Sequence, residues 1–180
     1  MSNQTFPERL DRKTIYESKW VSLYTDKVRM PDGHIIEAYH QIRYPNDSVC
    51  VVIVNEKDEI LLIQSKRYST GCLEWEIPAG GIDKDESPEE AARRECAEET
   101  GCTLKDLTYF CWQNPNNGMS DLKCHVFAAK VGTESQGFDE NEVRTKQWVS
   151  KEKVLEMLKN NEIRCGVSIL GLLYVMQFSI

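Results

Sequence analysis

Two patterns of apolar residues along the chain predict β-strands. Residues 14–43 alternate between apolar and polar positions around a Pro31-Asp32-Gly33 turn, which predicts an antiparallel meander of about three strands. Residues 49–54 form a continuous apolar run, which is typical of a strand buried on both faces. The polar residues 1–12 are expected to be irregular. Shorter runs predict further strands over residues 60–63, 73–77, 109–112, 124–131 and 143–149, with loops over 65–72, 114–118 and 132–141.

A different pattern predicts a helix over residues 88–100. Ser87 is a typical N-cap, Pro88 suits the first helical position, and Glu90 stands three residues after the cap. Gly101 is a natural C-terminal stop. Two more helices are expected near the C-terminus, one capped by Ser150 and one over the apolar residues 168–178. The first of them should direct inward the side chains of Val154, Leu155 and Leu158.

The order of these elements indicates the α+β class: a mixed sheet with helices on both faces, preceded by the antiparallel meander. Pro45-Asn46-Asp47 interrupts the strand pattern, so we expect an N-terminal part over residues 1–44 and a main domain over 45–180. The chain has 180 residues, of which 41% are hydrophobic and 28% charged, as in ordinary soluble domains.

Charge and cysteine usage narrow the function classes. A net charge of −7 disfavours a nucleic-acid binder that needs a basic surface. The segment MSNQTFPERL lacks an apolar core, so no signal peptide is expected, and no window approaches the ~18 apolar residues of a membrane span. The seven cysteines are scattered without a CxxC motif, and the three histidines share no ligand spacing with them. We therefore expect free thiols, no zinc site and a cytoplasmic location.

The helix over residues 88–100 carries its charges on an unexpected face. At about 100° per residue, Glu95, Glu98 and Glu99 fall on the side of Ala91, Ala92 and Cys96, which should face the protein. Clustered carboxylates repel one another, and partial burial increases that cost. A hard cation such as Mg²⁺ would resolve the conflict. The alternative is a solvated acidic helix face.

The spacing of this segment resembles a known motif. Gly80, Glu86 and the run Arg94-Glu95-Cys96-Ala97-Glu98-Glu99-Thr100-Gly101-Cys102 follow G-x5-E-x7-R-E-U-x-E-E-x-G-U, the Nudix box, where U is a bulky aliphatic residue. Cys96 and Cys102 replace the aliphatics, which is a mild departure because free cysteine packs as a small hydrophobe. The resemblance implies an αβα sandwich and a hydrolase that uses divalent metal to cleave a nucleoside diphosphate linked to another moiety.

The residues before the Nudix box extend the resemblance to one subgroup of the family. The run Glu76-Ile77-Pro78-Ala79-Gly80-Gly81-Ile82-Asp83 is similar to the E-x-P-A-G-x-I-D lead-in of ADP-ribose and nucleotide-sugar pyrophosphatases. That subgroup implies metal ligands at the Ala79 carbonyl, Glu95 and Glu99, with Glu98 supporting the metal cluster. It also implies a substrate contact at Gly80 and a catalytic role for Arg94, paired with Glu86. The expected metal is Mg²⁺, with Mn²⁺ as a second possibility.

Flanking positions supply the remaining site candidates. Arg67 resembles the arginine of a Q-Y-R segment that reaches substrate phosphate, although Ser65 and Lys66 stand where Gln-Tyr is usual; the alternative is a solvated loop cation. The resemblance places a catalytic base on a late loop, where Glu140 is favoured as the base and Glu142 as an assisting contact. The alternative is an ordinary acidic loop.

The N-terminal part supplies the last candidates. Lys19-Trp20-Val21, before Pro31-Asp32-Gly33, resembles the N-terminal segment that in ADP-ribose pyrophosphatases contributes an aromatic residue stacking on adenine across a homodimer. Trp20 is the candidate here, with Tyr39 as a second, while the alternative is a tryptophan that packs in the sheet. The leading hypothesis is therefore Mg²⁺-dependent hydrolysis of ADP-ribose or a related nucleoside diphosphate sugar. A nucleoside triphosphate pyrophosphatase and a non-catalytic nucleotide-sensing module are the alternatives.

Overall fold

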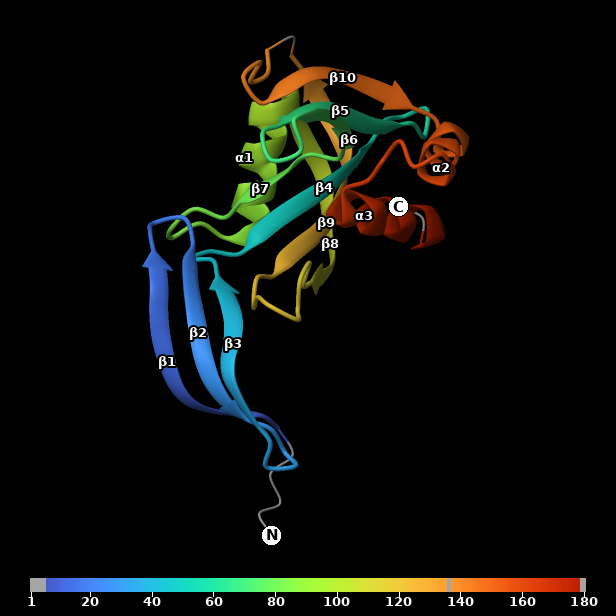
Figure 1. Cartoon of the computed structure of the whole chain (residues 1–180). Helices are drawn as coiled ribbons and strands as arrows, with labels where there is room; N and C mark the ends of the chain where they lie inside the picture. Colours follow the sequence, from blue (N-terminus) through green and yellow to red (C-terminus); the bar gives the residue numbers. More distant parts are fainter. Residues whose placement is uncertain (1–5, 136, 179–180) are drawn as a thin grey trace. The chain divides into compact units, whose positions relative to one another are not determined.

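The computed structural model describes residues 6–135 and 137–178, and its contacts divide the chain into two compact units. One unit runs to Pro45 and also contains Asn116–Leu122. The other contains Asn46–Pro115 and the chain from Lys123 onward. Each unit is built around its own sheet, of three strands in the first and seven in the second (Figure 1).

The first unit is an antiparallel meander of β1 (Glu8–Glu17), β2 (Ser22–Arg29) and β3 (Ile35–Arg43). The predicted three-strand meander is confirmed, but the expectation that residues 1–12 are irregular is wrong for residues 8–12, which belong to β1. Residues 1–5 lie outside the described residues. The Arg12 guanidinium donates two hydrogen bonds of 2.7 Å to the Asp26 carboxylate on β2. β1 is exposed on both faces and pairs with β2 through such polar contacts, so its sequence shows no alternation of apolar and polar residues.

The second unit contains a seven-stranded mixed sheet. Its central path runs in the order β10-β5-β4-β9-β8, while β6 pairs with β5 and β7 pairs with β4. Only the pairing of β4 with β9 is parallel among these described strands. The strands are β4 (Ser48–Val54), β5 (Ile60–Arg67), β6 (Cys72–Glu76), β7 (Ala79–Gly81), β8 (Cys102–Gln113), β9 (Cys124–Glu134) and β10 (Val143–Val149).

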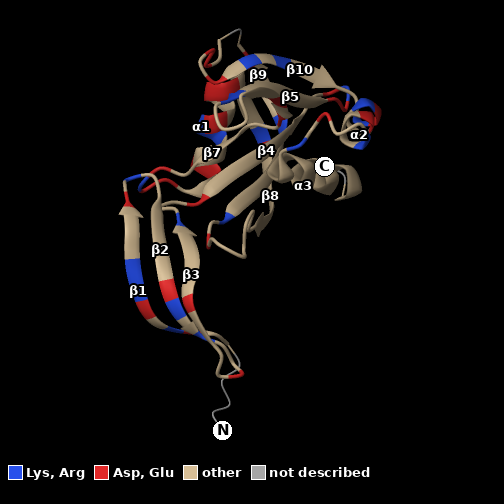
Figure 2. Ribbon diagram, viewed as in Figure 1, with Lys and Arg blue, Asp and Glu red and all other residues tan. Residues whose placement is uncertain are grey.

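Helices cover both faces of this sheet, so the expected αβα sandwich is confirmed. α1 (Pro88–Thr100) packs on one face, and α2 (Lys151–Lys159) and α3 (Gly166–Phe178) pack on the other (Figure 1). The uncharged strand β4 lies between them (Figure 2), and successive side chains alternate between the two layers. The core layer on the side of α1 contains the side chains of Val49, Val51 and Ile53, and the layer on the side of α3 contains those of Cys50, Val52 and Val54.

Several elements differ from the sequence-based expectation. β8 is much longer than residues 109–112, β5 continues through Arg67 into the expected loop, and Ala79–Gly81 form the short strand β7, where the sequence pattern predicts no strand. Ser150 caps α2 as predicted, but Leu155 is 50% exposed and the buried residues of that helix are Val154 and Met157. The seven cysteines are free thiols. Across the described residues, no helix combines the length and apolar character needed to cross a membrane.

Candidate active site

The helix α1 has well-defined ends that fix the side chains it carries. Ser87 Oγ accepts from the Glu90 amide at 3.2 Å, and the Glu90 carboxylate accepts from the Ser87 amide at 2.8 Å. Gly101 closes the helix in the left-handed conformation, at a φ of 67°, and donates its amide to the Ala97 carbonyl. The predicted helix over residues 88–100 and its reciprocal capping box are confirmed.

The three carboxylates of α1 are not equally buried. Glu99 is only 5% exposed and Glu95 is half-buried, whereas the Glu98 side chain is 56% exposed. The expectation that all three face the protein is therefore wrong for Glu98. At about 100° per residue, Glu95 lies about 40° from Glu99 around the helix, but Glu98 lies about 100° away, toward solvent.

Burial makes the two inner carboxylates difficult to charge. It raises the pKa of Glu99 to about 8, and the neighbouring carboxylates Glu95 and Glu142 act in the same direction. The Ala79 amide, which donates to Glu99 Oε2 at 2.8 Å, and the Arg67 guanidinium oppose that rise. Burial also raises the pKa of Glu95, against the pull of Arg94. Positive charge brought to this side of α1 would therefore stabilise both carboxylates.

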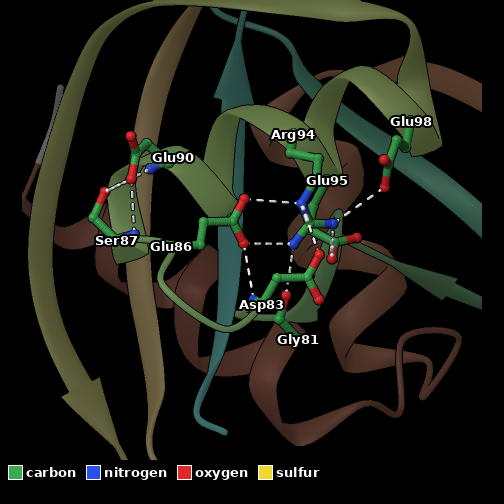
Figure 3. A network of polar contacts seen from close by, with 8 residues as sticks. All are labelled: Gly81, Asp83, Glu86, Ser87, Glu90, Arg94, Glu95 and Glu98. Atoms are coloured by element: carbon green, nitrogen blue, oxygen red, sulfur yellow. Dashed lines mark hydrogen bonds and ion pairs between the residues drawn. The ribbon is translucent and has the colours of Figure 1, made fainter.

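Arg94 organises the outer side of α1 (Figure 3). Its guanidinium donates to both carboxylate oxygens of Glu86, at 2.9 and 2.8 Å, and to the Gly81 carbonyl at 2.8 Å. The same side chain reaches Glu95 at 2.7 Å and Glu98 at 3.2 Å. The expected pairing of Arg94 with Glu86 is confirmed. It ties the loop that follows β7 to the helix, while a catalytic role for Arg94 stays a prediction.

Gly80 has a steric role beside the Glu95 carboxylate. A Cβ atom built on Gly80 would lie 2.1–2.2 Å from the carboxyl atoms of Glu95, closer than any real contact allows. The adjacent Gly81 would meet nothing within 4 Å. Gly80 thus leaves the space that Glu95 occupies, and its predicted contact with substrate stays a prediction.

These elements surround a cavity of about 540 Å³. The cavity joins the start of β7, the inner side of α1, the end of β5 and the loop before β10, and acidic positions mark α1 and that loop in Figure 2. A neighbouring cavity of about 390 Å³ shares Arg67, Glu99 and Glu142 with it. The larger cavity is lined by Arg67, Ala79, Gly80, Gly81, Glu95, Glu98, Glu99, Asp139 and Glu142.

Arg67 lies at the end of β5 and not in a loop. Its Nε donates to the Glu76 carboxylate at 2.8 Å, and its Nη2 donates to the second oxygen of the same group. Glu76 is almost fully buried on β6, while the Arg67 side chain remains 43% exposed at the cavities. The alternative of a freely solvated loop cation is therefore wrong, because the pairing holds the guanidinium in place.

The two candidate bases differ in their placement. Glu142 lines both cavities, whereas Glu140 lines neither of them. The sequence reasoning missed Asp139, which lines the larger cavity, and Lys66, which lines the smaller one. Asp139 carries no distinguishing pattern within the acidic run 139–142.

Trp20 and Tyr39 belong to the N-terminal unit, not to the unit that contains these cavities. Trp20 is 72% exposed, with the Lys19 ammonium 4.7 Å from its ring centroid. The high exposure makes the alternative of a sheet-packing tryptophan wrong. The Tyr39 hydroxyl donates to the Gly118 carbonyl at 2.9 Å. The roles of both residues at a nucleotide stay predictions.

Comparisons with known proteins agree with this architecture. Residues 44–165 match the NUDIX domain, and residues 8–42 match the nucleoside diphosphate sugar hydrolase N-terminal domain. An ADP-ribose pyrophosphatase of Bacillus subtilis is 31% identical over 155 residues, which cover 84% of this chain and 83% of that protein.

Two further matches extend over nearly the whole chain. A CMP-5'-(N-acetyl-N-hydroxy-3-aminopropyl)phosphonate hydrolase of Streptomyces rubellomurinus is 26% identical over 168 residues, covering 91% of this chain and 79% of that protein. A crystal structure of an ADP compounds hydrolase shares the fold, with a TM-score of 0.86 and 22% identity over 99% of this chain and 96% of that one.

Proposed function

The chain belongs to the Nudix family of hydrolases, and we propose that it cleaves the pyrophosphate bond of ADP-ribose or a related nucleoside diphosphate sugar. The observation that carries the chemistry is the cavity in which the carboxylates of α1 meet Glu142 and Arg67. The 31%-identical relative named an ADP-ribose pyrophosphatase supports the substrate class. The products would be a nucleoside monophosphate and a sugar phosphate.

Hydrolases of this family use divalent metal ions, and the donor set of the cavity fits such an ion. Within residues 6–135 and 137–178, no group of three acidic, histidine or cysteine side chains is already arranged to hold a metal; Glu95 and Glu98 accept from Arg94 instead. The buried Glu99, whose pKa is raised to about 8, nevertheless favours a nearby cation. Carboxylates with a backbone oxygen suit Mg²⁺, with Mn²⁺ as the alternative. The proposed ligands are the Ala79 carbonyl, Glu95 and Glu99, supported by Glu98.

Residues of the chain would perform the remaining steps. Bound metal would offset phosphate charge and lower the pKa of the attacking water. Arg67, held by Glu76, would bind a phosphate oxygen. Glu142 would accept the proton of the water as its oxygen bonds to phosphorus and the bridging P–O bond breaks. We favour Glu142 over Glu140 because only Glu142 lines the cavities.

The N-terminal unit would contribute to recognition of the base. The exposed ring of Trp20 suits stacking, and the match of residues 8–42 to an N-terminal domain of nucleoside diphosphate sugar hydrolases supports a role in substrate binding. Tyr39 is the second candidate. A homodimer would allow this unit to serve a partner's site, and light scattering at assay concentration tests for it.

A substrate panel tests the proposed function. ADP-ribose, other nucleoside diphosphate sugars, a CMP-linked phosphonate and nucleoside triphosphates are incubated with Mg²⁺, with Mn²⁺ or with EDTA. We expect metal-dependent release of a nucleoside monophosphate and a sugar phosphate from a nucleotide sugar. Faster cleavage of triphosphates would favour a triphosphate pyrophosphatase. Saturable binding without any cleavage would favour the sensing module.

A further inference from the structure

The loop that supplies Glu142 lacks the packing that fixes the helix carboxylates. We refer to residues 137–142, between β9 and β10, as the acidic loop. The side chains of Asp139, Glu140 and Glu142 are all exposed. Loop segments with few buried contacts open easily, so the position of Glu142 depends on how the backbone of this loop is held.

One side of the acidic loop is attached to the C-terminal end of α1. The Asp139 amide donates to the Glu98 carbonyl at 2.8 Å. Gly101 approaches the loop so closely that a Cβ atom there would lie 2.2 Å from the Gly137 carbonyl oxygen. Carbonyls in the last turn of a helix have no partner within the helix, and the loop satisfies one of them.

The other side of the acidic loop is attached to β5 through Lys66. The β5–β10 ladder ends at the pair Val143–Ser65, and the Lys66 amide extends it by donating to the Glu142 carbonyl at 2.8 Å. The Lys66 ammonium then donates to the Glu140 carbonyl at 2.5 Å. One residue therefore holds the backbone at Glu142 and again two positions earlier.

Lys66 stands where β5 leaves the core. Ser65 is buried, whereas Lys66 and Arg67, the last two residues of β5, are exposed. From there Lys66 lines the smaller cavity together with Glu99 and Glu142. A hydrogen bond from an ammonium is stronger than one between neutral groups, so this contact can restrain an exposed loop.

We propose that Lys66 is a positioning residue that holds the Glu140 carbonyl and thereby keeps the Glu142 carboxylate at the cavity. This inference rests on the proposed function for its catalytic consequence, but not for the restraint of the loop. The competing role for Lys66 is direct contact with a substrate phosphate, which its place in the cavity wall also allows.

Steady-state kinetics separate these two roles. Displacing a reacting group by about 1 Å costs up to roughly 100-fold in rate, so Lys66→Met should lower kcat by roughly 10- to 100-fold with little change in KM. Lys66→Arg, which keeps a cationic donor, should restore most of kcat. Lys57→Met, at an exposed lysine between β4 and β5, is the matched control and should retain wild-type kcat.

A double variant strengthens this test. If Lys66 acts through Glu142, Lys66→Met combined with Glu142→Gln should be no slower than Glu142→Gln alone. A raised KM for Lys66→Met together with multiplicative losses in the double variant would overturn the proposal, because that pattern indicates phosphate binding.

Hydrogen–deuterium exchange provides a readout without any substrate. In Lys66→Met, a peptide covering residues 137–142 should exchange faster than in the wild type, while a peptide covering residues 88–100 stays unchanged. Equal exchange of the 137–142 peptide in both proteins would overturn the proposal. A wild-type protein that cleaves no nucleotide sugar would overturn the proposed function, whereas the exchange result would still decide whether Lys66 restrains the loop.

Discussion

α1 and the acidic loop supply carboxylates to the same cavity in opposite ways. On α1, Glu99 and Glu95 are wholly or partly buried and stand on a helix packed against the sheet through Ala91, Ala92 and Cys96. On the loop, Glu142 is exposed, and its backbone is fixed by Lys66. The first group is thus positioned by core packing, and the second by hydrogen bonds to a few backbone atoms.

This difference suits two different chemical tasks. A buried carboxylate with a raised pKa gains most from a cation, because the cation offsets the cost of keeping the charge out of water. An exposed carboxylate on a loop can reach a water molecule in the open cavity and pass its proton to solvent. Variants of the buried carboxylate should therefore affect metal binding, whereas variants of the exposed carboxylate should affect proton transfer.

The largest effect is expected for Glu99→Gln. The variant keeps an oxygen that accepts the Ala79 amide but removes the proposed ligand charge. Metal ions contribute several kcal/mol to such reactions, so kcat/KM should fall by roughly 10³-fold, with weaker binding of Mg²⁺ in a thermal-shift titration. Glu89→Gln, on the exposed face of α1, is the matched control and should change little. Unchanged metal binding in Glu99→Gln would remove Glu99 from the ligand set.

The same residue predicts how stability depends on pH without metal. Burial raises the pKa of Glu99 from 4.5 to about 8, so the folded protein holds a proton that the unfolded chain has released. The contribution of the Glu99 carboxyl to the free energy of unfolding is therefore fully present below pH 4.5. It decreases as the pH rises toward 8, by at most about 1.4 kcal/mol per pH unit. Carboxyls with lowered pKa, such as Asp26, act below this window. Urea denaturation in EDTA measures the effect.

Glu99→Gln is the control for that measurement as well. The variant has no proton to lose at this position, so its free energy of unfolding should vary less with pH across the same window. A wild-type stability that rises with pH between about 5 and 8 would contradict the burial of an uncompensated Glu99 carboxyl.

The parts of the fold that the sequence predicts well are those with a local signature. The capped ends of α1 and the continuous apolar run of β4 carry their information within a few neighbouring residues. β1 is exposed on nearly all positions and β8 on about half, so their strand state depends on backbone pairing with β2 and β9, which no periodicity records.

The site divides in the same manner. The helical projection predicts that Glu95, Glu98 and Glu99 share the protein-facing side of α1, which holds for Glu95 and Glu99 but not for the exposed Glu98. The placement of Lys66 and Asp139 at the cavities could not be predicted from the sequence. The Lys66 ammonium is held by the Glu140 carbonyl and the Asp139 amide by the Glu98 carbonyl, and both partners are distant along the chain. The choice between Glu140 and Glu142 depends on the same loop backbone.

The next effect is expected at the two acidic loop residues. Glu142→Gln should lower kcat by roughly 100-fold or more, which is the usual contribution of a general base, whereas Glu140→Gln should remain within a few-fold of the wild type. Each variant is the other's matched control, because the two residues have the same chemistry and stand two positions apart. Equal losses would indicate that the acidic loop contributes charge and not one positioned base.

The smallest effect is expected for Gly80→Ala. Its Cβ would meet the Glu95 carboxylate at 2.1–2.2 Å, and Arg94 holds that carboxylate at 2.7 Å, so the side chain must leave its position. Disturbing the surroundings of a ligand typically costs about 10- to 100-fold in metal affinity or activity. Gly81→Ala, which meets nothing within 4 Å, should keep wild-type values. The Mg²⁺ concentration for half-maximal activity measures the shift, and equal values for both variants would show that Glu95 need not lie against Gly80.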